Sequence, residues 1–173
     1  MADPTIEEVD EFIAGYKTLS GFLPEFDQTY GWDWVTRWGI LDVRGRQNAE
    51  LVFTINAALT HPTICCIYRK RLIYRVDIVP MDEIKHNEFG ALAVGLPAVV
   101  QGPHAHPWPE HRDFVRQNGF GELPFRKPVD IADVQFIRAL EVASTDLNIH
   151  VEPSQRECEP PKQAALFADR NGL

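Results

Sequence analysis

Residues 63–79 read Thr-Ile-Cys-Cys-Ile-Tyr-Arg-Lys-Arg-Leu-Ile-Tyr-Arg-Val-Asp-Ile-Val, and this stretch decides the fold. Two runs rich in β-branched and aromatic residues flank a basic tripeptide that suits an exposed hairpin tip. In the second run alternate residues are apolar, and side chains alternate between the two faces of a strand. The apolar face comprises Leu72, Tyr74, Val76 and Ile78. We therefore expect two antiparallel strands, with Arg75 and Asp77 together on the opposite face.

The flanking sequence adds strands before this hairpin and a helix at each end. Residues 34–43 and 51–55 have strand-like composition or alternation. Residues 5–19 repeat apolar side chains at helical intervals, and Thr5 followed by Glu8 has capping-box spacing. A second helix is predicted to open at Asp130 or Asp133 and to end near Asp146, followed by a closing strand over 147–151.

Residues 80–130 interrupt this pattern with closely spaced proline and glycine. Proline breaks a helix interior, so this density predicts loops with one short strand and no long helix. Three of the six histidines, His104, His106 and His111, fall inside this stretch. Long irregular segments of compact domains often carry the functional residues.

Together these elements predict an α+β fold. It consists of an N-terminal helix, an antiparallel sheet of three to five strands, a long Pro/Gly-rich loop and one C-terminal helix packed on the sheet. The length of 173 residues fits one domain, assigned to 1–151. The polar, proline-containing tail, 152–173, is expected to be flexible.

The composition limits the function classes. The formal net charge is −8, which argues against a protein that coats nucleic acid, although a local basic patch remains compatible with it. No apolar run is long enough to span a bilayer, and the acidic N-terminus is unlike a signal peptide. Three cysteines form no disulfide framework. We expect a cytoplasmic protein without membrane contact.

Two pairs of residues could carry chemistry. Arg75 and Asp77 lie two apart on one strand face, where they can form an ion pair that is either functional or merely a surface contact. In an extended segment His104 and His106 point the same way, close enough to share a metal ion or a phosphate. One imidazole could also act as base and the other as acid.

The spacing His104-x-His106 followed by Glu110 matches part of the cupin metal motif. The glycine expected before the first histidine and the later histidine motif are missing, and a helix is expected where a cupin continues with barrel strands. A cupin-like metal protein is therefore kept as one alternative.

The order of motifs resembles a family of small bacterial domains of uncharacterised function. These motifs are the Tyr74-Arg75-x-Asp77 strand, His86-Asn87, and Pro103-His104-x-His106. The group is similar to TumE-type toxins of toxin–antitoxin pairs. The resemblance covers about residues 34–150, and the sequence departs from it in a longer loop before His104 and in the absence of a proline beside His86.

The resemblance implies a toxin-like nuclease or phosphoesterase. In a metal-independent version His104 and His106 act as acid and base, Arg75 stabilises negative charge on phosphate, and Asp77 orients its neighbours. In the alternative version a divalent metal is held by Asp77, His86, His104 and His106. Substrate would be bound by Arg69 and Arg71. Trp108, held between Pro107 and Pro109, could form a pocket wall or equally a hydrophobic plug. A basic face could gather Arg69, Lys70, Arg71, Arg112 and Arg116.

A second class of function is a non-catalytic binding module, antitoxin-like or defence-associated, in which the polar loop is an interface. In the tail, Gln163, Leu166 and Phe167 fit the pattern of peptides that dock on the bacterial sliding clamp. These residues could equally pack on the domain. Convergence of Arg75, Asp77, His104 and His106 in one concave pocket would favour the enzyme, and their dispersal on a flat surface would favour the binding module.

Overall fold

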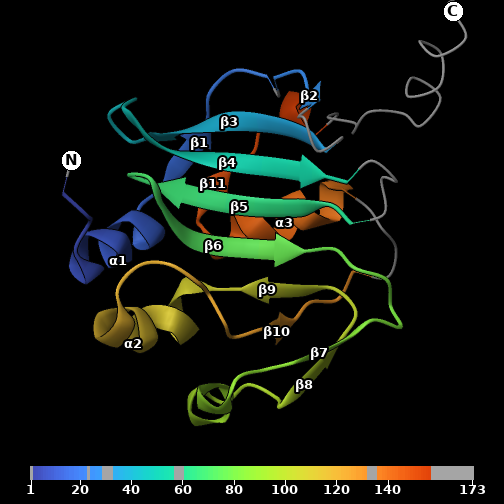
Figure 1. Cartoon of the computed structure of the whole chain (residues 1–173). Helices are drawn as coiled ribbons and strands as arrows, with labels where there is room; N and C mark the ends of the chain where they lie inside the picture. The colour runs from blue at the N-terminus through green and yellow to red at the C-terminus, as the bar shows by residue number, and fades with distance from the viewer. Residues whose placement is uncertain (1, 23, 29–32, 57–60, 132–135, 157–173) are drawn as a thin grey trace, which may run out of the picture.

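A computed structural model describes residues 2–22, 24–28, 33–56, 61–131 and 136–156 (Figure 1). The described residues form one large sheet of nine strands in the order β10-β9-β6-β5-β4-β3-β1-β11, with β2 also paired to β3. The four long central strands are β3 (Trp34–Asp42), β4 (Gln47–Ile55), β5 (Thr63–Tyr68) and β6 (Arg71–Asp77). The shorter strands are β1 (Lys17–Leu19), β2 (Asp27–Gln28), β9 (His104–His106), β10 (Lys127–Pro128) and β11 (Ile149–His150), of which β10 and β11 end the strand order.

The α+β class is confirmed, but the sheet is larger than the predicted three to five strands. The additional strands are only two or three residues long, which is too short to leave a recognisable period in the sequence. The sheet is antiparallel except at one edge, where β11 pairs with β1 in parallel.

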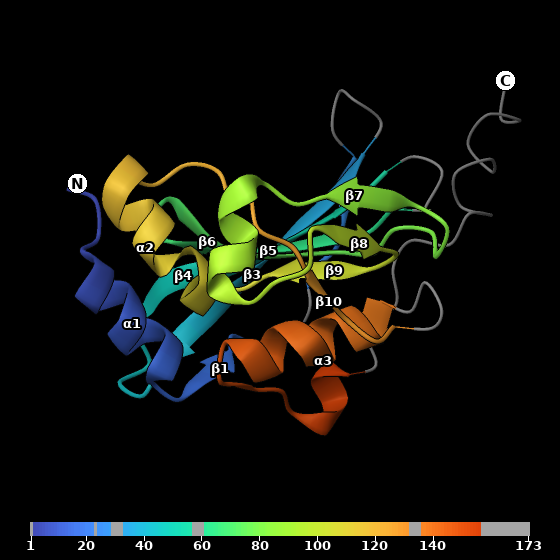
Figure 2. The same cartoon turned by 90° about the horizontal axis from the view of Figure 1, so that it is seen from below.

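The hydrophobic core lies on one face of the central strands. A cross-strand row of Trp38, Leu51, Cys66 and Tyr74 is almost inaccessible to solvent. Helix α3 (Phe136–Asp146) runs along this face, as the two views show (Figure 2), and Asp146 Oδ2 accepts a 2.9 Å hydrogen bond from the Tyr74 hydroxyl. The other face of β5 and β6 carries Thr63, Cys65, Arg75 and Asp77, in the alternation that the sequence predicts.

The alternation fails at one residue of β6. A bulge opposite Cys66 and Ile67 leaves Ile73 as an extra residue, so that Leu72 pairs with Ile67 and Tyr74 with Cys66. Ile73 is therefore buried in the core, and Leu72 moves to the face that carries Arg75. The prediction that Leu72 belongs to the core face is wrong for this reason.

The N-terminal helix is shorter than predicted. Helix α1 spans Ile6–Ala14, and its capping box forms between Thr5 and Glu8 as expected. After Gly15 the chain turns into β1, where the buried Lys17 donates from Nζ to the carbonyls of Phe12, Ile13 and Gly15. This ammonium group satisfies carbonyls that the end of a helix leaves without partners.

The prediction for residues 80–130 is also wrong. This stretch contains the eleven-residue helix α2 (Trp108–Asn118) and four short strands, including a separate ribbon of β7 (Ile84–His86) and β8 (Val99–Gln101). Pro107 caps α2 and Pro109 lies in its first turn, where a missing N–H costs nothing. The ribbon and the 3-10 helix η1 (Phe89–Val94) project beyond β9 at the lower edge of Figure 1.

At the C-terminal end the part of the chain that the structure describes continues past residue 151. The 3-10 helix η2 (Pro153–Gln155) buries Gln155, whose amide donates to the carbonyls of Leu19 and Gly21. Gln163, Leu166 and Phe167, the proposed sliding-clamp motif, lie outside the described residues. Among the helices that the structure describes, none is both long enough and apolar enough to cross a membrane.

Candidate metal centre

The β6–β9 ladder places the candidate residues side by side. Asp77 is the direct cross-strand partner of His104, and Arg75 is the partner of His106. On the other side of β6, Thr63 is the partner of Asp77. Side chains of paired residues lie on the same face of a sheet, so the register alone brings these five side chains together.

Asp77, His104 and His106 form a candidate metal-binding group, in which both histidines approach one carboxylate oxygen of Asp77. His106 Nε2 lies 3.2 Å and His104 Nε2 lies 3.6 Å from Asp77 Oδ2. One potential ligand atom from each of the three residues lies within 4.8 Å of the others. The three residues are at most 6% exposed, so the group is shielded from bulk water.

Backbone carbonyls fix the orientation of both imidazoles. His104 Nδ1 lies 3.0 Å from the carbonyl oxygen of Gly102, and His106 Nδ1 hydrogen-bonds to the carbonyl of Leu123. A carbonyl oxygen only accepts, so both Nδ1 atoms must donate. In a neutral imidazole the other nitrogen then carries the lone pair. When both rings are neutral, their Nε2 atoms therefore present lone pairs toward Asp77, the arrangement that second-sphere hydrogen bonds impose on metal-binding histidines. A protonated His106 would instead donate from Nε2 to Asp77 Oδ2, 3.2 Å away.

The second carboxylate oxygen of Asp77 is held by two other donors. Asp77 Oδ1 accepts hydrogen bonds from the Thr63 hydroxyl at 2.9 Å and from Arg75 Nε at 2.8 Å. Burial alone would raise the pKa of Asp77, but the contacts with His106 and Arg75 outweigh burial and lower it. Asp77 is therefore an anion with one oxygen committed to Thr63 and Arg75 and the other directed at the histidines.

His111 supports the centre from behind. This fully buried side chain donates from Nδ1 to the carbonyl of Pro107 at 2.7 Å and accepts from the amide of Phe125 at 2.9 Å. Burial lowers the pKa of His111 to about 4, so the ring is neutral at neutral pH. It anchors the segment that supplies the Leu123 carbonyl to His106. His111 is thus a positioning residue outside the metal-binding group.

The donor set fits a divalent transition metal. With both rings neutral, two Nε2 lone pairs and one oxygen of Asp77 face each other, and the three ligand atoms lie within 4.8 Å of one another. Burial lowers the pKa of His104, although its hydrogen bond to the Gly102 carbonyl acts in the opposite direction. The His104 ring is therefore a poor source of a proton to place between its Nε2 atom and Asp77 Oδ2. Two imidazoles and one carboxylate suit Mn²⁺, Fe²⁺, Co²⁺, Ni²⁺ or Zn²⁺.

The centre lies in a cavity of about 260 Å³ with charged walls. Arg75, Lys85 and Arg126 line it together with His61 and Glu83. Glu83 pairs with Lys85 at 2.6 Å and lies 3.4 Å from His61. Among these wall residues only Arg75 was predicted from the sequence. His61, Glu83, Lys85 and Arg126 were missed because they come from separate loops and short strands with no common spacing.

Arg75 and Arg126 are exposed enough to meet a ligand. The Arg75 side chain is 44% exposed although two of its nitrogens contact Asp77. A guanidinium has five N–H donors, so donors remain for an anion in the cavity. Arg126 Nη1 contacts the carbonyls of His86 and Pro124 at 3.0 and 3.2 Å, which fixes its position at the rim.

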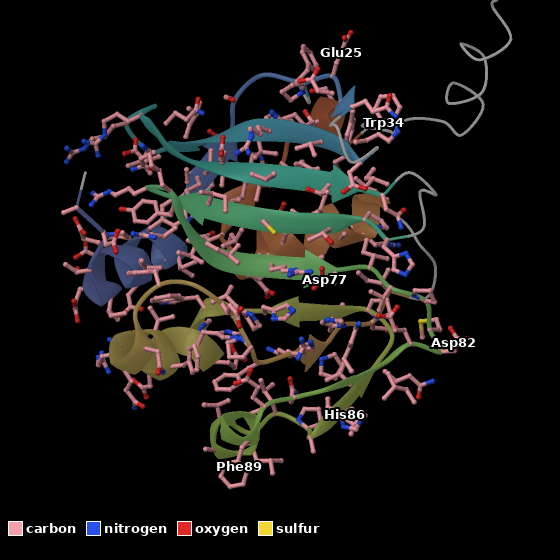
Figure 3. All side chains as sticks on the ribbon, in the orientation of Figure 1. Glu25, Trp34, Asp77, Asp82, His86 and Phe89 are labelled. Carbon is pink, nitrogen blue, oxygen red and sulfur yellow. The ribbon has the colours of Figure 1, made fainter. Side chains whose placement is uncertain are left out.

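His86 lies outside the metal-binding group. It is exposed on β7, in the projecting ribbon, whereas Asp77 lies on β6 in the main sheet (Figure 3). The fourth ligand suggested by the resemblance is therefore not placed at the centre by this structure. The backbone of His86 nevertheless contributes, through the contact with Arg126.

Arg69 and Arg71 lie at the far end of β6, about 20 Å from Asp77 by the rise of a strand. Each contacts a carboxylate, Glu8 for Arg69 and Asp3 for Arg71. Arg112 and Arg116 are likewise paired with Asp10 and Asp113. The expected basic face is therefore neutralised by neighbouring acids, and it does not border the cavity around the metal-binding group.

Trp108 and Glu110 also take places other than those expected. Trp108 is 2% exposed and donates from Nε1 to Asp10 at 2.7 Å, so it links α2 to α1 instead of lining the cavity. Glu110 lies 3.6 Å from Lys127 and is absent from the metal-binding group, where Asp77 supplies the carboxylate. The cupin-type role for Glu110 gains no support.

Comparisons with protein-family models, with curated proteins and with solved structures found no match to this chain.

Proposed function

We propose that this protein is a hydrolase of phosphate esters that uses a divalent metal held by Asp77, His104 and His106. The observation that carries the proposal is the convergence of two Nε2 lone pairs on Asp77 Oδ2, with each Nδ1 committed to a backbone carbonyl. Three electron-pair donors that face one another repel unless a cation or a shared proton lies among them. A toxin-type nuclease is the specific form of this activity that the sequence resemblance implies.

The charges around the cavity support an anionic substrate. Arg75, Lys85 and Arg126 line the cavity together with the carboxylates of Asp77 and Glu83, which leaves a formal excess of one positive charge in a protein whose formal net charge is −8. Arginine forms bidentate contacts with phosphate oxygens and stabilises charge that develops there. When bound, a divalent metal supplies an activated water at neutral pH. The described residues orient the ester, and Arg75 both fixes Asp77 and reaches the cavity.

Arg75, Asp77, His104 and His106 line one cavity, which favours an enzyme over a non-catalytic binding module. The metal-independent alternative draws support from one distance. His106 Nε2 and Asp77 Oδ2 are 3.2 Å apart, which suits a hydrogen bond from a protonated imidazole. That proton would account for His106, but the Nε2 atom of His104 would still face the carboxylate without a donor.

The test measures metal content and hydrolysis on the same preparation. Dialysis against Mn²⁺, Ni²⁺, Zn²⁺ or Mg²⁺ should leave about one ion per chain for at least one metal, and hydrolysis of nitrophenyl phosphates should require it. Asp77→Asn and the double variant His104→Ala/His106→Ala should lose both properties. His86→Ala removes an exposed histidine outside the group and is the matched control.

The outcomes separate the alternatives. Hydrolysis that persists in chelator and vanishes in the double variant would support acid–base catalysis without metal. Absence of both metal binding and hydrolysis in protein shown to be folded by circular dichroism would exclude the proposed enzyme and favour the binding module.

A further inference from the structure

A second cavity of about 280 Å³ adjoins the metal-binding group. It shares Arg75, His106 and Arg126 with the first cavity, and these three side chains form the boundary between the two. Three segments form its remaining wall. Leu72 comes from the start of β6 and Glu88 from the loop before η1. The loop before β10 supplies Gly121, Glu122, Leu123 and Pro124. The two cavities therefore lie on either side of a pair of guanidinium groups.

Two features outside the metal-binding group shape the second cavity and its boundary. The bulge in β6 places Leu72 on the face that carries Arg75, where it lines the second cavity and still packs against the core. Asn87 fixes the backbone of Arg126, because its Oδ1 accepts from the Arg126 amide at 2.6 Å and its Nδ2 donates to the Arg126 carbonyl at 2.8 Å. The His86-Asn87 motif thus positions Arg126 through backbone contacts.

The two cavities differ in charge. Arg75 and Arg126 line both cavities. The first adds Lys85 against Asp77 and Glu83, whereas the second adds Glu88 and Glu122, with no further cation, beside apolar Leu72, Leu123 and Pro124. The two glutamates offset the two arginines, so the second cavity has no formal excess of positive charge to hold a second phosphate. A neutral group with apolar surface and N–H donors, such as a nucleobase, would pack on the leucines and donate to the carboxylates.

We infer that the substrate is a phosphodiester whose phosphate lies against Arg75 and Arg126 on the side of the metal-binding group, with one of its two ester substituents in the second cavity. This inference rests on the proposed function and specifies its substrate class. A phosphate monoester has one substituent and leaves the second cavity empty. In hydrolysis, the water oxygen bonds to phosphorus, the bond from phosphorus to the leaving oxygen breaks, and one proton from water passes to the leaving group, with no oxidant or reductant required.

Gly121 offers a way to fill the second cavity without disturbing the metal centre. A Cβ atom placed at Gly121 meets nothing within 4 Å, and Gly121 is not among the glycines with positive φ. Gly121→Phe should therefore fold and occlude the second cavity, which Gly121 lines. Gly121→Ala is the matched control, since one methyl group leaves most of the cavity open.

The experiment compares bis(4-nitrophenyl) phosphate with 4-nitrophenyl phosphate in the metal-loaded protein. The wild type should have the higher kcat/KM on the diester. Gly121→Phe should lower the diester kcat/KM by about tenfold or more, with the monoester kcat/KM and the metal affinity within about twofold of the wild type. Gly121→Ala should change neither substrate by more than about twofold.

The inference and the proposed function fail in different ways. Metal-dependent hydrolysis that favours the monoester, or a diester rate unaffected by Gly121→Phe, would overturn the diester inference and leave the hydrolase intact. An equal loss on both substrates in Gly121→Phe would also overturn the inference, because the second cavity would then serve no specific substituent. Lack of hydrolysis of either substrate by metal-loaded wild type would overturn both.

Discussion

Asp77 and His104 face each other across the β6–β9 ladder, with Asp77 Oδ2 3.6 Å from His104 Nε2. They belong to different strands, so any ion that both residues bind cross-links β6 to β9. Binding to the folded chain alone stabilises it by mass action. The stability of the whole domain thus becomes a readout of the site, independent of any substrate.

We predict that a divalent metal raises the melting temperature. When the free metal concentration is one hundred times Kd, the free energy of unfolding rises by about 2.7 kcal/mol. This corresponds to a rise in the melting temperature of about 5 to 10 °C for a domain of this size. Differential scanning fluorimetry with Mn²⁺, Ni²⁺ and Zn²⁺ measures it. Asp77→Asn should abolish the shift and His86→Ala should retain it. A shift of equal size in Asp77→Asn would place the bound ion elsewhere.

Thr63→Val should weaken metal binding by about 10- to 100-fold, the usual effect of removing an outer-sphere hydrogen bond. The Thr63 hydroxyl donates to Asp77 Oδ1 and helps to orient the oxygen that faces the histidines. Isothermal titration calorimetry measures the change. Thr54→Val is the matched control, because Thr54 is the β4 partner of Thr63 on the same face of the sheet. Equal affinities for the two variants would contradict a role for Thr63.

His111 should give the protein a distinct dependence on pH. Its pKa lies at about 4 in the folded chain, against 6.5 as the ordinary value, so the unfolded chain binds the additional proton between these two values. The free energy of unfolding should therefore fall as the pH drops from 6.5 to 4, by about 3 kcal/mol from this group, and this contribution should stay constant above pH 6.5.

Urea unfolding of the wild type and of His111→Phe between pH 4 and 7 isolates this contribution. The variant should be less stable at pH 7, because the Phe125 amide and the Pro107 carbonyl lose their partner, and its stability should fall less steeply with acid. His150→Phe replaces an exposed histidine and should keep the wild-type slope. Parallel slopes for the wild type and His111→Phe would show that His111 is not the titrating group.

Lys17→Met should destabilise the fold by about 2 kcal/mol, although methionine retains much of the apolar stem. Burial lowers the pKa of Lys17 to about 8, so at pH 7 the ammonium group is charged and serves the last carbonyls of α1. Chemical denaturation measures the loss, and Lys70→Met at the exposed hairpin tip is the control. A Lys17→Met variant as stable as Lys70→Met would mean that water satisfies these carbonyls equally well.

Local sequence patterns anticipated the parts of the fold that depend on local interactions. The hairpin of β5 and β6 and the capping box of α1 each follow from residues within a few positions of one another. The pairing of β6 with β9 does not, because the strands are separated by residues 78–103 and β9 has only three residues. Register between distant strands is set by tertiary packing, which leaves no period in the sequence.

The candidate site was also predictable only where it depends on local sequence. Placement of Arg75 with Asp77 on one strand face, and of His104 with His106 on one side of an extended segment, was predictable from alternation. The contacts that orient them, from the Leu123 carbonyl, the Thr63 hydroxyl and the ring of His111, come from segments far apart in the chain. Helix α2 was missed because prolines at its start resemble a loop in composition.

The ribbon of β7 and β8 leaves the sheet after β6 and returns at β9, so the metal-binding residues flank it without belonging to it. Register between β6 and β9, and not the path of the intervening chain, sets the spacing of Asp77, His104 and His106. The ribbon supplies Glu83 at its base and Lys85 to the cavity wall, and exposes Ile84 and Val99. Replacement or lengthening of this excursion would therefore alter the cavity wall while leaving the β6–β9 register of Asp77, His104 and His106 in place.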